Sequence, residues 1–106
     1  MALHTIKIHV VPRRGVGWRI LVTPNRQRAR WKDEIQWVCQ APERQAPFVV
    51  YFGPSGPMAS PVYTQARPKG KVKYRALFSL CIFKYSVGVF YQNEIKLLDP
   101  ELEIVP

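Results

Sequence analysis

The sequence predicts an all-β fold, in the form of a two-sheet antiparallel β-sandwich of seven or eight strands. The chain has 106 residues and a mass of 12.3 kDa, so we expect one domain spanning residues 1–106. A hydrophobic content of 47% is sufficient for one core. Ten prolines and six glycines divide the chain into short segments, a spacing typical of strands and turns rather than of helices.

Alternation of apolar and polar residues predicts the first strands. Residues 5–11, 18–23 and 71–77 each direct every second side chain toward an apolar face. In residues 71–77 the expected core face contains Val72, Tyr74 and Ala76. Each of these strands is therefore expected to bury one face and to expose the other.

Residues 25–40 allow two interpretations. Trp31, Ile35 and Val38 have the spacing of a helical stripe. We favour a loop over residues 25–32 and a strand over residues 34–39, because that strand concentrates residues with low helix propensity and Pro42 follows it.

The remaining strands are predicted from short apolar runs between turn residues. Residues 48–52 are continuously apolar, which favours a strand buried on both faces, and residues 53–61 form a loop rich in proline and glycine. Residues 82–90 and 101–105 complete the set. We expect a turn at Gln92-Asn93 and a break at Asp99-Pro100.

Several of these segments resemble cupredoxin-like domains. Asp33-Glu34-Ile35-Gln36-Trp37 resembles the start of a strand in that family, where a turn residue and a β-branched residue precede a tryptophan. Phe52, residues 83–87 and residues 98–105 resemble further strands of the family, so the resemblance covers roughly residues 6–105. It implies a cupredoxin-like sandwich. An immunoglobulin-like sandwich is the architectural alternative, although Cys39 follows Trp37 instead of preceding it.

The ligands that hold copper in cupredoxins are missing from this sequence. The family uses a His from the middle of the domain, then Cys, His and usually Met around the last loop. No His follows His9, no Cys, His or Met follows Cys81, and Val87 occupies the position of the family's cysteine. The resemblance therefore implies a scaffold without the redox centre, and we expect no metal and no cofactor.

The charge of the chain is strongly and unevenly basic. The net charge is +9 and the pI is about 10.0. Residues 1–32 contain eight Lys or Arg and no acid, and residues 67–96 contain seven Lys or Arg and one acid. This distribution predicts attraction to an acidic protein partner or to nucleic acid.

Two candidate binding regions follow from these patterns. Arginines for phosphate contacts beside an aromatic ring for stacking are typical of a nucleic-acid surface. The residues proposed for it are Arg13, Arg14, Arg26, Arg28, Arg30, Trp31, Lys32, Lys71, Lys73 and Arg75. The proline-stiffened loop, with Pro54, Pro57 and Met58, is the candidate contact with a protein. We expect a non-enzymatic binding or assembly module, with nucleic-acid binding as the alternative.

Catalytic chemistry is not expected. His4 and His9 have opposite strand parity, which disfavours a shared metal ion, and Ser55 and Cys81 lack a nucleophile motif. We expect a cytoplasmic protein with two reduced cysteines, because residues 1–7 do not form a secretory signal. No membrane partner is expected, because the most apolar window, residues 76–91, is shorter than the roughly 20 residues that cross a bilayer. The oligomeric state is left open.

Overall fold

The computed structural model describes every residue except 14, 16, 42–45 and 65–67. Its regular structure consists of strands, with no helix among the described residues, which confirms the all-β class. The molecule is elongated, with extents of 48 × 23 × 22 Å. The strands are β1 (Leu3–Arg13), β2 (Gly17–Thr23), β3 (Arg26–Ala29), β4 (Glu34–Gln40), β5 (Phe48–Tyr51), β6 (Val62–Tyr63), β7 (Lys69–Lys71), β8 (Cys81–Lys84), β9 (Ser86–Tyr91), β10 (Glu94–Leu98) and β11 (Glu101–Ile104).

The described strands form three sheets where the sequence analysis expected two. The first sheet has the order β2-β1-β4-β7, the second has the order β10-β9-β5-β6, and the third has the order β3-β11-β8. Two of the pairings, β1 with β4 and β3 with β11, are parallel. The strand count is eleven, so the expected two antiparallel sheets of seven or eight strands do not describe this arrangement.

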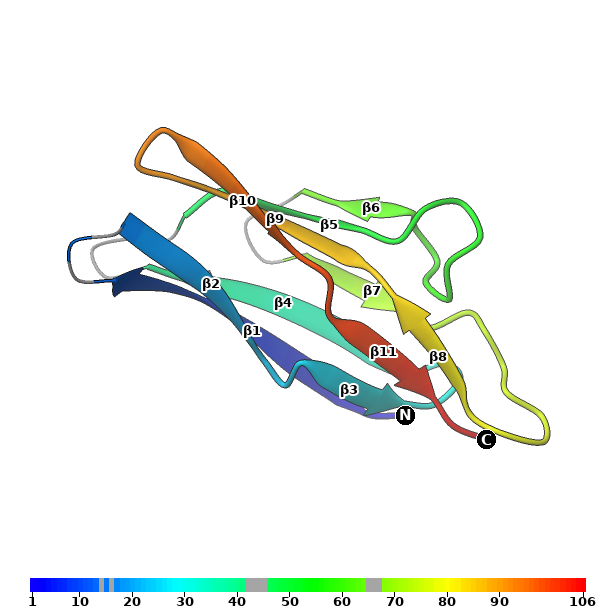
Figure 1. Cartoon of the computed structure of the whole chain (residues 1–106). Helices are drawn as coiled ribbons and strands as arrows, with labels where there is room; N and C mark the ends of the chain where they lie inside the picture. The colour runs from blue at the N-terminus through cyan, green and yellow to red at the C-terminus, as the bar shows by residue number, and fades with distance from the viewer. Residues whose placement is uncertain (14, 16, 42–45, 65–67) are drawn as a thin grey trace.

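The third sheet arises because the chain changes partners at three short interruptions. Pro24 separates β2 from β3, Tyr85 separates β8 from β9, and Asp99-Pro100 separates β10 from β11. Proline has no N–H for the ladder, so strand pairing stops at two of these points. Figure 1 shows the third sheet continuing the second one toward the end of the molecule where both termini lie.

Aromatic side chains fill the space between the first and second sheets. The Trp37 indole on β4 lies 5.3 Å from the Tyr63 ring and 6.0 Å from the Tyr85 ring, measured between centroids. Trp37 Nε1 donates a hydrogen bond to Tyr85 Oη. Farther along, Trp18 on β2 packs edge-on against Tyr91 on β9 at 5.5 Å. These contacts hold the two layers together.

Four strand predictions are confirmed by the structure, one of them the strand over residues 101–105, where β11 spans Glu101–Ile104. Residues 5–11 lie in β1, residues 18–23 in β2 and residues 34–39 in β4. In each of these three strands one alternating set of apolar residues faces the core, because one face of the sheet is buried, whereas Leu21 on the other face of β2 is exposed. The helical alternative for residues 25–40 is excluded, since Ile35 and Trp37 are two residues apart and both buried.

Other predictions were wrong. Residues 26–29 form β3 and not a loop, because β11 supplies carboxylates opposite its arginines. The strand expected over residues 71–77 is replaced by β7, which ends at Lys71, and Tyr74 is exposed. Strand β5 buries one face, since Tyr51 is exposed. Strand β10 follows the expected turn at Gln92-Asn93 and was not predicted.

Candidate functional site

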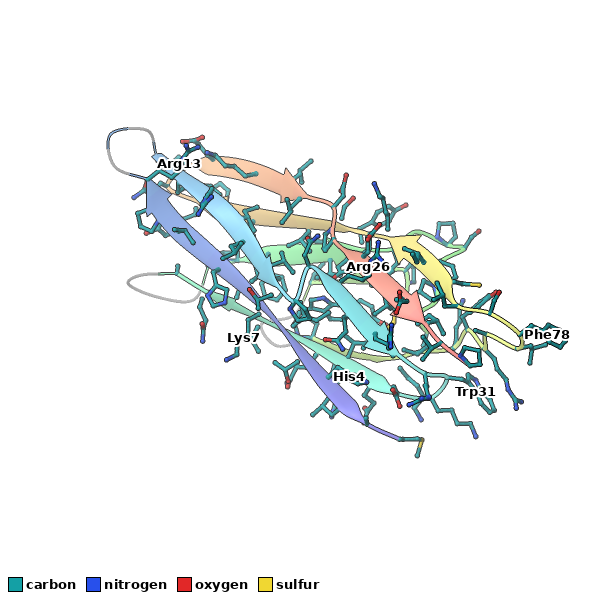
Figure 2. The ribbon with its side chains drawn as sticks, turned by 60° about the horizontal axis from the view of Figure 1, so that its bottom comes forward. His4, Lys7, Arg13, Arg26, Trp31 and Phe78 are labelled. Atoms are coloured by element: carbon teal, nitrogen blue, oxygen red, sulfur yellow. The ribbon has the colours of Figure 1, made fainter. Side chains whose placement is uncertain are left out.

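The basic residues expected to bind nucleic acid lie at different parts of the molecule. Arg13 lies at the hairpin between β1 and β2, and Trp31 lies at the opposite end (Figure 2). Arg14 lies outside the described residues. The ten residues therefore do not form one surface.

Two of these arginines are engaged by acidic residues of β11. The parallel register sets Arg26 opposite Glu101 and Arg28 opposite Glu103. Arg26 Nη2 lies 2.7 Å from Glu101 Oε1, and Arg28 Nε lies 2.7 Å from Glu103 Oε2. Glu103 is buried. These guanidinium groups hold β3 against β11 and are less available for phosphate.

Trp31 and two cations form a cluster at the end of the molecule. Lys32 Nζ lies 4.4 Å from the centroid of the Trp31 ring, and Arg75 Cζ lies 4.7 Å from it. The backbone joins the two chain segments, since Lys32 N donates to Val72 O. The two basic blocks of the sequence therefore meet here, although the cations lie on the ring that a base would stack on.

The loop that carries Trp31 is held by Asp33, which is buried. Its carboxylate accepts hydrogen bonds from Ala2 N at 2.9 Å and Arg30 N at 3.0 Å, and it lies 2.9 Å from His4 Nε2. Burial acts to raise the pKa of Asp33, but these hydrogen bonds outweigh it, and the pKa is lowered overall. His4 is partly buried beside this carboxylate.

The other predicted cations are spread along exposed positions. Lys71 ends β7, and Lys73 follows it with its N–H bonded to Pro57 O. Arg30 Nε donates to Pro106 O at 3.1 Å.

Two of the three residues named in the candidate protein-binding loop, Pro57 and Met58, point into the protein. Met58 is only 2% exposed and forms an isolated bridge with Val72, and Pro57 is also buried. Pro54 is exposed. A contact through Met58 is therefore excluded, because the loop packs its methionine into the core.

An apolar surface that the sequence did not reveal lies on the outside of the second sheet. Between β9 and β10, the register sets Phe90 opposite Ile95 and Gly88 opposite Leu97. On the other side of β9, Gly88 lies opposite Val49 of β5. Tyr51 of β5 lies opposite Ser86 of β9 and Val62 of β6. The alternate residues of these strands face the core, so this set faces outward. We define the apolar face by its six large side chains, Val49, Tyr51, Val62, Phe90, Ile95 and Leu97.

Exposure and charge distinguish the apolar face. Ile95 is 69% exposed and Leu97 is 71% exposed. None of the eight described residues that the register assigns to this side of the sheet is charged. The outside of the first sheet instead carries Lys7, Arg19 and Lys71. The strands of the second sheet thus present an apolar outer face, which borders Asp99 at Ser86, and the first sheet presents a basic outer face.

Strand β10 has an inverted pattern that exposes its apolar residues. Lys96 points inward, where its Nζ donates to Trp18 O and lies 5.0 Å from the Trp18 ring. Ile95 and Leu97 therefore point to solvent. The hairpin turn at Gln92-Asn93, both with positive φ, is the signal that predicts the pairing of Phe90 with Ile95.

Comparison with known proteins adds no identification. Neither a protein family model nor a curated protein matches the chain. The resemblance to cupredoxin-like domains remains a prediction. In the described part of the chain, three or more His, Cys, Asp or Glu side chains do not gather in a group suited to a metal ion. That part also contains no helix with the length and apolar character needed to cross a membrane.

Proposed function

We propose that this chain is a non-enzymatic assembly module that binds a second copy of itself through the apolar face. The observation that carries the proposal is the set of large, uncharged, exposed side chains on one side of the second sheet. Its five most exposed members present on the order of 500 Å² of surface, the size at which a patch on a monomer is often functional.

A second copy is favoured because of charge. With a net charge of +9, two copies that meet through their basic sides repel each other. The apolar face is neutral and is compatible with itself across a two-fold axis, which is the usual symmetry of a homodimer. Sheet faces also pack well against one another at about 10 Å. A dimer of this kind leaves both basic sides outward.

The proposal also covers the finer description of the fold. We class the domain as a cupredoxin-like β-sandwich in which the first sheet forms one layer and the second and third sheets together form the other. The aromatic contacts of Trp37 with Tyr63 and Tyr85 support two packed layers.

The test is the association state of the parent and of the variant Leu97→Lys, measured by sedimentation equilibrium over a concentration series. A buried leucine contributes about 1.5–3 kcal/mol, and a symmetric dimer buries Leu97 twice. The variant should therefore dissociate at least about a hundredfold more readily.

The matched control is Leu21→Lys, because Leu21 is 46% exposed on β2 and lies on the opposite, basic side. It should leave the dimer intact. A parent that stays monomeric at about 100 μM, or a Leu97→Lys variant that dimerises like the parent, refutes the proposal.

A further inference from the structure

A second exposed apolar feature lies at the end of the molecule, away from the apolar face. Residues 77–80 are the last part of the connection between β7 and β8, and we call them the tip loop. Phe78 is 95% exposed and Leu77 is 64% exposed, and Leu80 is also exposed. Figure 2 shows Phe78 at the extreme end of the elongated molecule, with Trp31 at the same end.

The base of the tip loop is held in place. Tyr74 Oη lies 3.3 Å from Cys81 Sγ across the base, and the Tyr74 ring packs edge-on against Phe83 at 5.0 Å. Tyr74 N donates to Pro57 O, and Ala76 is buried. The exposed side chains therefore project from an anchored base, and the fold does not bury them.

Three cations lie near this end of the molecule. Lys32 and Arg75 lie against Trp31, and Lys73 is exposed two residues before Arg75. We call Lys32, Lys73 and Arg75 the tip cations. No acidic residue occurs between Glu43 and Glu94 in the sequence. Asp33 is buried and held by its hydrogen bonds, and the partly exposed Glu34 lies 3.8 Å from Lys69 Nζ.

We propose that the tip loop docks the protein on the surface of an anionic lipid bilayer. Leu77, Phe78 and Leu80 enter the boundary between headgroups and acyl chains, and the tip cations contact the anionic headgroups. Trp31 then lies at headgroup level, where tryptophan is favoured. Docking of this kind needs no spanning segment, so the argument from the short apolar window does not exclude it.

A bilayer suits these residues better than nucleic acid does. Leu77 and Leu80 flank Phe78 and gain nothing from base stacking, which uses flat rings. Trp31 already has two cations on its ring. A convex tip with aliphatic side chains and nearby cations combines apolar burial with attraction to negative charge, the two contributions that govern binding at a bilayer surface.

The experiment is co-sedimentation of the full chain with phosphatidylcholine vesicles, with and without about 30% phosphatidylserine. We expect binding that requires phosphatidylserine and weakens with salt. Trp18 and Trp37 are buried, so a blue shift of tryptophan emission on binding reports on Trp31. Phe78→Ser should lower the partition constant at least about tenfold, and Arg75→Gln about fivefold.

Two control variants separate this site from the general charge of the protein. Lys7→Gln removes one exposed cation from the outside of the first sheet, and Leu21→Ser removes an exposed leucine there. Both should bind vesicles nearly as the parent does. Leu97→Lys, which tests the apolar face, should also leave vesicle binding in place, so the two proposals fail separately.

Four results overturn the proposal. These are absence of binding to phosphatidylserine vesicles, equal binding by Phe78→Ser and the parent, an equal loss for Lys7→Gln and Arg75→Gln, and binding of a labelled single-stranded oligonucleotide without binding of vesicles. The last result assigns the Trp31 cluster to nucleic acid. Because Phe78 has almost no buried surface, its replacement should not change the thermal melting curve.

Discussion

Replacement of Gly70 by alanine tests the contact between the two layers. Gly70 lies on β7 of the first sheet, and Tyr63 lies on β6 of the second. A Cβ added at Gly70 would overlap Tyr63 Oη and Cζ and lie 2.7 Å from Cε1. The ring has little room to move, because it packs 5.3 Å from Trp37 and its Oη accepts a hydrogen bond from Ser60 N at 3.2 Å.

The expected loss of stability follows from these contacts. Overpacking of this kind costs about 1–3 kcal/mol, and loss of the Ser60 hydrogen bond adds about 1 kcal/mol. Gly70→Ala should therefore lower the free energy of unfolding by about 2–4 kcal/mol, a large part of the 5–15 kcal/mol of a typical domain. The corresponding fall in Tm is about 10–25 °C.

Urea unfolding of a double-mutant cycle provides the assay. Tyr63→Leu removes Oη, Cζ and Cε1, the three atoms that the new Cβ would meet. In that background Gly70→Ala should cost less than about 1 kcal/mol. The matched control is Gly88→Ala, whose Cβ would meet only Leu97 Cδ2 at 3.1 Å and Val49 Cγ1 at 3.2 Å and would contact no atom of the first sheet. If Gly70→Ala lowers the free energy of unfolding equally in the parent and in the Tyr63→Leu background, the proposed contact between Gly70 and Tyr63 is refuted.

Two further predictions concern titratable groups. The pKa of Asp33 is lowered in the folded state. The ionised carboxylate therefore makes its full contribution to the free energy of unfolding above the unfolded-state pKa of about 3.9, and this contribution is lost as the pH falls through the folded-state pKa. Asp33→Asn should therefore lower Tm at pH 7, and the difference from the parent should shrink toward about pH 2; a difference independent of pH contradicts this reasoning. Burial raises the pKa of Cys39 to about 11. A thiol reagent at about pH 8 should therefore modify Cys81 in the native protein and Cys39 only after unfolding. Peptide mapping of the labelled protein tests this expectation.

Periodicity in the sequence predicted the strands that bury one complete face. In β1, β2 and β4, every second residue is apolar and contacts the core, so the pattern and the structure agree. Prediction failed for β3 because its strand has no apolar periodicity. That strand is held by Arg26 and Arg28 opposite Glu101 and Glu103, residues 75 positions apart in the chain. A pattern of neighbouring residues in the sequence cannot reveal a pairing between residues so far apart.

The candidate site was harder to predict because its residues look like core residues. Val49, Phe90 and Leu97 have the composition of buried strands, and only the register of three neighbouring strands reveals that they face outward. The sequence identified the basic residues but did not predict their contacts in the fold. Their spacing in the chain did not reveal that Arg28 pairs with Glu103 while Arg75 lies on Trp31.

Strand β10 was not predicted, and the outward orientation of its apolar residues was not predicted either. It gives the strongest reason to treat the apolar face as functional. A strand with Lys96 outward and Ile95 and Leu97 inward would satisfy the ordinary pattern, yet the structure has the opposite orientation. Turning Lys96 inward removes part of its ammonium group from water, which costs free energy. The hydrogen bond to Trp18 O and the contact with the Trp18 ring offset this cost. Local rules broken in this way are expected at functional sites, because stability alone favours the ordinary pattern. The inverted strand therefore supports the proposal that a second copy covers Ile95 and Leu97, while Leu98 of the same strand packs against the core.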